Sequence, residues 1–292
     1  HESDARKSQP ADGQSVVGAE AGRISVGYDW KTFPVGGRFF TDIWKTLPKQ
    51  SQSSLHLCAL SSEKINGGER FVKYKAAIFD LDGTLVDTLE DLASSVNEML
   101  TSYGFPTHSL EAYRYYLGNG SKKLIERTLP QEQAQDASFV LEAMKRYQAI
   151  YEHHRDHTRP FPGIQPMLDE LKAKGIPMGV CTNKHQQAAD EIIDGMFPSG
   201  IFTIVMGDRP GLPIKPDPKK PLMMAEAYGV NPEEVAYFGD TSVDMDTAVN
   251  AGFLPIGVLW GFRTEEELLA HGAKVILAKP EELFGKVEFA GE

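Results

Sequence analysis

The segment from Lys75 to Thr88 reads K-A-A-I-F-D-L-D-G-T-L-V-D-T and constrains the fold more than any other part of the chain. Its apolar run, Ala76–Phe79, is expected to form a buried strand, and two aspartates, Asp80 and Asp82, follow it directly. Side chains two apart on an extended chain share a face, so both carboxylates can approach one metal ion and one phosphate group. In parallel α/β sheets ligands bind at the carboxyl ends of strands. The segment therefore predicts the catalytic edge of such a sheet.

Three further polar groups follow expected strand ends or lie in an expected turn. They are Thr182-Asn183-Lys184 after an expected strand at 177–181, Lys215 in the turn 214–218, and Asp240 with Asp244 after an expected strand at 235–238. A hydroxyl and backbone N–H groups at a strand-to-helix turn can hold phosphate oxygens. Taken singly, Thr182 and Asp244 could be plain helix N-caps, and Lys215 a surface lysine. The neighbouring Lys219 and Lys220 are expected at the surface.

In this order the four groups resemble the four motifs of the haloacid-dehalogenase-like (HAD) phosphohydrolases, and the resemblance covers residues 73 to about 287. It implies an α/β fold with a Rossmann-like parallel sheet and an inserted helical cap of type one. Softer signals at 87–92, 117–120, 124–127, 182–184 and 259–262 are most similar to bacterial phosphoglycolate phosphatases.

The regular pattern of strands and helices begins only near residue 72, which divides the chain. Residues 1–71 are expected to be an N-terminal extension, either translated leader or vector sequence, with an accessory domain as the alternative. Residues 72–88 and 160–292 are expected to form the HAD-like catalytic core. Residues 89–159 carry apolar side chains at helical spacing and are expected to form a four-helix cap.

The resemblance implies a nucleophile, an acid–base group and a metal site. Asp80 would attack phosphorus and form an aspartyl-phosphate, while Asp82 would protonate the leaving group and then activate water. Mg²⁺, a hard cation that prefers oxygen, would be held by Asp80, the main-chain carbonyl of Asp82, and Asp240. Asp244 would support the metal shell or hold Lys215 in place.

The same resemblance implies how the substrate is held. Thr182, Asn183 and Lys215 would bind and stabilise the transferring phosphoryl group. The loop Gly118-Asn119-Gly120 precedes an expected helix, so its backbone N–H groups could contact the rest of the substrate. The expected substrate is a small phosphorylated metabolite, with hydrolysis of 2-phosphoglycolate to glycolate and phosphate as the first choice. The alternatives are a sugar-phosphate phosphatase or mutase and an inorganic pyrophosphatase of the same fold. A dehalogenase or a non-enzymatic binding module fits the retained carboxylates and lysine poorly.

Net charge and cysteine content limit which partners and which cellular compartment are expected. The net charge is −11 while residues 1–72 are nearly neutral, so the acidic remainder is unsuited to nucleic acid. No run approaches the roughly 20 apolar residues of a membrane helix, and no membrane partner is expected. The only two cysteines, Cys58 and Cys181, favour a reducing compartment, hence a cytoplasmic location. The histidines at 153, 154 and 157 are expected in a solvated hinge. The sequence carries no signal for the number of subunits.

Overall fold

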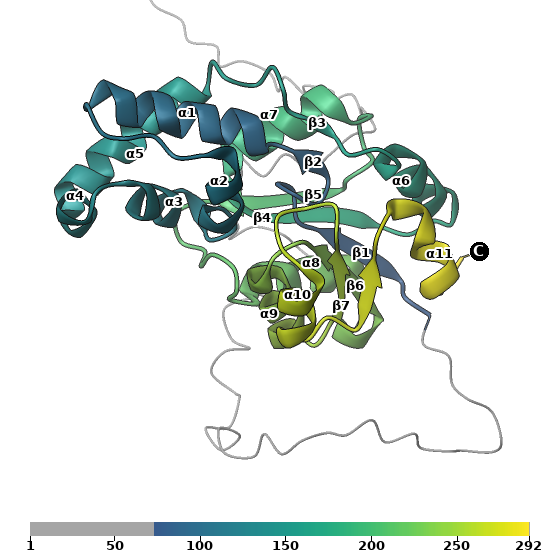
Figure 1. Cartoon of the computed structure of the whole chain (residues 1–292). Coiled ribbons are helices and arrows are strands. Elements are labelled where there is room, and N and C mark those ends of the chain that lie inside the picture. The colour runs from purple at the N-terminus through teal and green to yellow at the C-terminus, as the bar shows by residue number, and fades with distance from the viewer. Residues whose placement is uncertain (1–72, 292) are drawn as a thin grey trace, which may run out of the picture.

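A six-stranded sheet forms the centre of the computed structural model, which describes residues 73–291 (Figure 1). The expected N-terminal extension, residues 1–71, lies outside the described part. The strand order is β5-β4-β1-β6-β7-β8 and every pairing is parallel. The strands are β1 (Ala76–Phe79), β4 (Met178–His185), β5 (Ile204–Asp208), β6 (Val235–Gly239), β7 (Leu254–Val258) and β8 (Val275–Leu277). The predicted α/β fold with a parallel sheet is confirmed.

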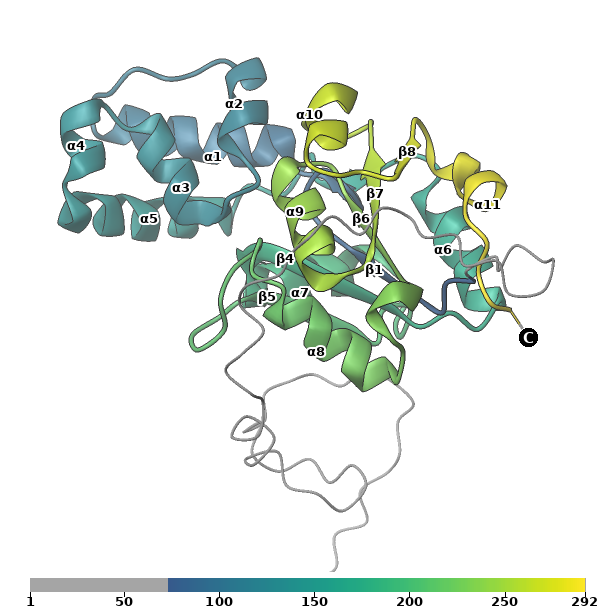
Figure 2. The same cartoon turned by 90° about the horizontal axis from the view of Figure 1, so that it is seen from below.

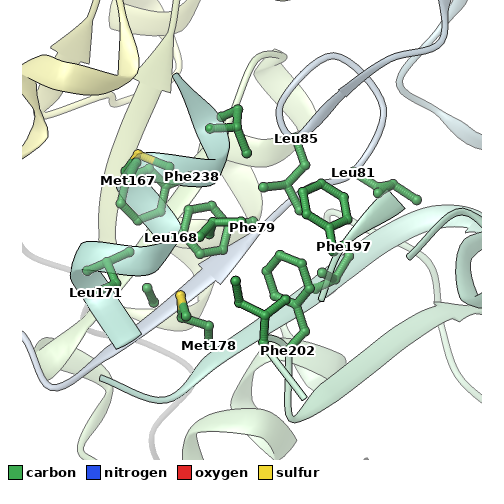
Figure 3. Close-up of a cluster of buried hydrophobic side chains, with 14 of the residues drawn as sticks. Phe79, Leu81, Leu85, Met167, Leu168, Leu171, Met178, Phe197, Phe202 and Phe238 are labelled. Carbon is green, nitrogen blue, oxygen red and sulfur yellow. The ribbon is translucent and has the colours of Figure 1, made fainter. Parts of the chain in front are cut away.

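The central strand β1 is buried on both faces, which explains its unbroken apolar sequence. Ala77 and Phe79 join one apolar cluster, while Ala76 and Ile78 join the cluster on the opposite face. Phe79 stacks on Phe238 of β6 with ring centroids 4.5 Å apart (Figure 3). Burying a side chain of this size stabilises the fold by about 2–3 kcal/mol. The strand is therefore held firmly up to its last residue, and Asp80 comes next.

Helices cover both faces of the sheet. The apolar side chains of α6 (Ile164–Ala173), α7 (Gln186–Met196) and α11 (Leu283–Lys286) join the cluster that contains Phe79. Those of α8 (Lys219–Tyr228) and α9 (Ser242–Ala251) join the opposite cluster. The short helix α10 (Glu265–Ala270) contacts α9 and β7. The core is thus a three-layer helix–sheet–helix arrangement.

The segment inserted between β1 and β4 is helical and has its own apolar cluster. Its helices are α1 (Leu89–Ser102), α2 (Leu110–Tyr116), α3 (Gly120–Thr128), α4 (Gln131–Gln135) and α5 (Ala137–Tyr151). Figure 2 shows them grouped beside one end of the sheet. The sequence predicted four helices; the short α4 buries no residue, so it has no apolar periodicity by which it could be recognised.

Two connecting segments join this insertion to the core, and they lie side by side. The strands β2 (Val86–Asp87) and β3 (Arg159–Pro160) pair in antiparallel fashion. The buried carboxylate of Asp91 in α1 accepts hydrogen bonds from Thr158 N at 2.6 Å and from His157 N at 3.2 Å. Burial alone would raise the pKa of Asp91, but hydrogen bonds from Thr158 and His157 lower it below its usual value. A charged anchor therefore fixes the start of α1 to the returning chain.

Several strand boundaries differ from the prediction. The strand expected at 177–181 runs on to His185, so Thr182-Asn183-Lys184 lie within β4 rather than after it. The strand β8 was not predicted, because it has only three residues and two of them are partly exposed. Within residues 73–291, no helix has the length and apolar character needed to cross a membrane.

Candidate active site

The carboxyl edge of the sheet gathers the polar residues that the sequence singled out. Asp80 follows β1, Thr182 and Asn183 lie in β4, Lys215 precedes α8, Asp240 follows β6, and Asp244 lies in the first turn of α9. All six side chains are buried. Since these strands are neighbours in the sheet, their ends meet although the residues are up to 164 positions apart.

Lys215 lies at the centre of this group rather than at the surface. Its Nζ is 2.8 Å from Asp80 Oδ1 and 2.6 Å from Asp244 Oδ1. Asn183 fixes the same residue through its backbone, accepting a hydrogen bond from Lys215 N at 2.8 Å and donating one to Lys215 O at 3.2 Å. Burial alone would lower the pKa of Lys215, but Asp244 and Asp80 raise it well above its usual value. The two carboxylates therefore favour the charged form of this ammonium.

The site holds more negative than positive charge. Burial and the nearby charge of Asp244 raise the pKa of Asp80 to about 7, although Lys215 opposes this shift. Burial, Asp244 and Asp80 likewise raise the pKa of Asp240 well above its usual value. One oxygen from each of Asp80, Asp240 and Asp244 lies within 4.8 Å of the others. A divalent cation at this point would relieve the repulsion among these carboxylates.

The hydrogen-bond partners of Asp244 and Asp240 differ. Asp244 uses Oδ1 for Lys215 and Oδ2 for the backbone N–H and hydroxyl of Thr241, at 3.0 and 2.7 Å. Asp240 accepts one hydrogen bond on each oxygen, from Thr84 Oγ1 at 2.8 Å and Phe262 N at 2.9 Å. A carboxylate oxygen has further lone pairs, so Asp240 keeps capacity for a metal. This set of oxygen donors fits a hard divalent cation.

Gly83 lets the chain pass close to Asp240, and its replacement offers a test of the metal site. Its φ is +85°, and an added Cβ would lie 2.3 Å from Asp240 Oδ2. Gly83→Ala should displace this carboxylate, weaken divalent-metal binding about tenfold or more, and lower the free energy of unfolding by about 1–3 kcal/mol. Metal titration by calorimetry, with a melting curve, measures both effects.

Gly104→Ala is the matched control for this variant. Gly104 has a similar φ of +77°, but an added Cβ there would have no atom within 4 Å. It should lose stability through backbone strain alone and keep its metal affinity. Metal affinity that is also unchanged in Gly83→Ala would contradict a role for Asp240 as a metal ligand.

Asp82 has a different partner from Asp80. Its Oδ1 accepts a hydrogen bond from Lys184 Nζ at 2.9 Å, and both side chains are largely buried. The same ammonium lies 4.6 Å from the centre of the Tyr151 ring in α5. Burial alone would lower the pKa of Lys184, whereas Asp82 raises it above its usual value. Sequence reasoning gave Lys184 no role, because nothing local links positions 82, 151 and 184.

A cavity of about 330 Å³ lies between this edge and the helical insertion. Asp80, Asp82, Thr182, Asn183 and Lys184 line it from the core, and its lining from the insertion includes Leu92, Leu117, Gly118, Gly120, Leu124, Tyr147 and Tyr151. Two of the three residues expected in the substrate loop, Gly118 and Gly120, thus reach the cavity, and Asn119 does not line it. Gly118 O also accepts a hydrogen bond from Asn183 Nδ2 at 3.3 Å. The insertion therefore faces Asp80 and Asp82 across this cavity.

The expectation that Lys220 lies at the surface is wrong. This side chain is fully buried, and its Nζ donates hydrogen bonds to Thr182 O at 2.9 Å and Gly207 O at 3.2 Å. The position is the second residue of α8, where a long side chain can reach back under the ends of β4 and β5. Lys220 thereby fixes the backbone of Thr182, while the neighbouring Lys219 is exposed as expected.

Comparisons with known proteins agree with this geometry. The family model described as haloacid dehalogenase-like hydrolase matches residues 77–258. A phosphoglycolate phosphatase of Thiobacillus denitrificans is 35% identical over 191 residues, covering 64% of this chain and 84% of the relative. One of Pseudomonas putida is 29% identical over 206 residues, covering 70% of this chain and 76% of the relative.

A solved structure shows the same fold. The crystal structure of a putative phosphoglycolate phosphatase from Lactobacillus delbrueckii subsp. bulgaricus has a TM-score of 0.67 and 30% sequence identity. The match covers 72% of this chain and 96% of that one. With the family match over residues 77–258 and the buried carboxylates at the sheet edge, the chain belongs to the haloacid dehalogenase-like hydrolases and is a phosphatase of that family.

Proposed function

We propose that this chain is a Mg²⁺-dependent phosphomonoesterase that hydrolyses 2-phosphoglycolate to glycolate and phosphate. The observation that carries the proposal is the contact of Lys215 with both Asp80 and Asp244, directly behind a cavity that Asp80 lines. The phosphoglycolate phosphatases among the relatives support the choice of substrate. A cavity of about 330 Å³ also favours a small ester.

In the proposed mechanism the carboxylate of Asp80 attacks phosphorus in line with the leaving oxygen. The bond from phosphorus to the leaving oxygen breaks, and Asp82 gives a proton to that oxygen. Asp80 is then phosphorylated, which divides the hydrolysis into two easier steps. In the second step Asp82 takes a proton from water, the water oxygen attacks phosphorus, and the Asp80 carboxylate is released.

The other residues stabilise charge during this transfer. Lys215 already contacts Asp80, so its ammonium can neutralise the oxygens of the transferring phosphoryl group. Thr182 and Asn183 line the same cavity and would donate to phosphate oxygens. Asp80, Asp240 and the main-chain carbonyl of Asp82 would hold Mg²⁺, which supplies positive charge to the phosphoryl oxygens when bound. Asp244 would keep Lys215 in position rather than bind the metal.

A phosphate-release assay over small metabolites tests this proposal. With Mg²⁺ present, 2-phosphoglycolate should be hydrolysed with the highest kcat/KM in a panel that includes sugar phosphates and pyrophosphate. Chelation of the divalent metal should abolish turnover by at least about 10³-fold, because the charge on the phosphoryl group loses its main stabilisation. Activity that persists in excess chelator would contradict the metal dependence. A sugar phosphate or pyrophosphate as the best substrate would contradict the substrate.

Composition adds predictions about the surroundings of the enzyme. A cytoplasmic location follows from the low cysteine content, and the acidic charge argues against nucleic-acid partners. No membrane partner is expected, and a small phosphorylated metabolite remains the proposed ligand.

A further inference from the structure

Lys184 places a positive charge at the wall of the cavity, beside Asp82. Its Nζ lies 2.9 Å from Asp82 Oδ1, and its side chain is 7% exposed. A charged lysine this deeply buried is uncommon, because removing the ammonium from water is costly unless a partner compensates. An ammonium has three N–H donors, and Asp82 Oδ1 takes one of them.

The surroundings of Lys184 hold its ammonium at the cavity wall. The Lys184 Nζ lies 4.6 Å from the centre of the Tyr151 ring, within the range of a cation–π contact. Tyr147 stacks near Tyr151 with ring centroids 5.8 Å apart, and both rings line the cavity. Leu92 and Leu124 line the cavity as well, so part of its wall is apolar. An anionic group that enters this region would need a positive partner there.

The other cationic side chains are already matched with carboxylates. Lys184 and Arg155 are the only Lys or Arg side chains that line the cavity in the described part of the chain. Arg155 pairs with Glu191 at 2.5 Å, and Lys215 contacts both Asp80 and Asp244. Lys184 pairs with a single carboxylate, that of Asp82, and Asp82 is the proposed proton donor to the leaving oxygen. The ammonium therefore lies beside the place where the leaving group must be.

From this juxtaposition we propose that Lys184 selects phosphate esters whose leaving group carries a carboxylate on the carbon attached to the ester oxygen. This inference rests on the proposed function. In 2-phosphoglycolate the ester oxygen and the carboxylate are bonded to the same methylene carbon. If the ester oxygen lies at Asp82, the carboxylate lies close to the group that neighbours Asp82, which is Lys184. A charge-assisted hydrogen bond from this buried ammonium would then distinguish this ester from uncharged ones.

Paired substrates test the proposal. Ethyl phosphate has the same O–CH₂ linkage as 2-phosphoglycolate but a methyl group in place of the carboxylate. Lys184→Met should reduce the ratio of kcat/KM for 2-phosphoglycolate to that for ethyl phosphate by about 10- to 100-fold. Lys184→Arg should keep part of the ratio. Lys122→Met, at an exposed lysine paired with Glu126, is the control and should leave the ratio unchanged.

The ratio of the two kcat/KM values separates recognition of the substrate carboxylate from a general effect on Asp82. If Lys184→Met lowers kcat/KM for both esters by the same factor, the residue serves only to position Asp82 and the proposal is overturned. The ratio of the Kd for ethyl phosphate to the Kd for 2-phosphoglycolate gives an answer without turnover. It is measured by calorimetry with Mg²⁺ in the non-hydrolysing Asp80→Asn background, with and without Lys184→Met. A wild-type enzyme that hydrolyses both esters equally well overturns carboxylate recognition and leaves the phosphatase function standing. If neither ester is hydrolysed the proposed function fails, and the Kd ratio still decides the role of Lys184.

Discussion

Asp80→Asn should reduce turnover of any phosphate ester by about 10⁴-fold or more while the protein stays folded. An amide at this position cannot form the acyl phosphate, so the two-step route is closed. The change is nearly isosteric and keeps an oxygen for Lys215, which lies 2.8 Å from Asp80 Oδ1 in the wild type. Steady-state phosphate release at saturating Mg²⁺, with circular dichroism of the same sample, measures both parts of this prediction.

Asp87→Asn is the matched control for Asp80→Asn. Asp87 lies in β2 on the same connecting segment and is outside the cavity lining. Its replacement should leave turnover within about threefold of the wild type, as expected of a substitution away from the chemistry. Turnover by Asp80→Asn within tenfold of the wild type would remove Asp80 as the nucleophile, and with it the aspartyl-phosphate mechanism.

Lys215→Met should lose both activity and stability. Without the ammonium, the buried carboxylates of Asp80 and Asp244 repel each other and keep no positive partner, which costs about 3–5 kcal/mol of unfolding free energy. Loss of one charge-stabilising donor should also lower kcat by about 10²- to 10³-fold. Chemical denaturation and steady-state kinetics measure the two effects.

The exposed Lys219 lies in the same segment and provides the comparison for Lys215. Lys219→Met should change the unfolding free energy by less than about 0.5 kcal/mol. Added Mg²⁺ should recover part of the stability lost in Lys215→Met, since the cation would compensate the same carboxylates. Equal stability of the two variants would show that the ion pairs of Lys215 are energetically unimportant.

Local patterns were enough to predict the floor of the site. The apolar residues of β1 identified a doubly buried strand, and Asp80 and Asp240 each follow such a strand directly. Because parallel strands present their carboxyl ends at one edge, their order along the chain implied that they would meet. In the structure Lys215 and Asp244 contact each other beside Asp80 at this edge. Their catalytic and metal-binding roles stay predictions.

Long-range side-chain contacts could not be predicted in this way. The pair of Lys184 and Asp82 and the contact with Tyr151 depend on how the insertion sits on the core. The burial of Lys220 depends on two carbonyl groups, one in each of two neighbouring strands, which no sequence pattern signals. The short helix α4 has no buried side chain and therefore no apolar period.

The pairing of β1 has a consequence for the order in which the enzyme is made. Its two neighbours in the sheet, β4 and β6, begin about 100 and 160 residues later in the chain. Asp80 therefore leaves the ribosome long before the strands that enclose it, whereas α1–α5 have mostly local contacts and can form earlier. A nascent chain that stops before Asp244 would have the helical insertion but only part of the catalytic edge. The catalytic edge is thus complete only after the chain has been made as far as Asp244.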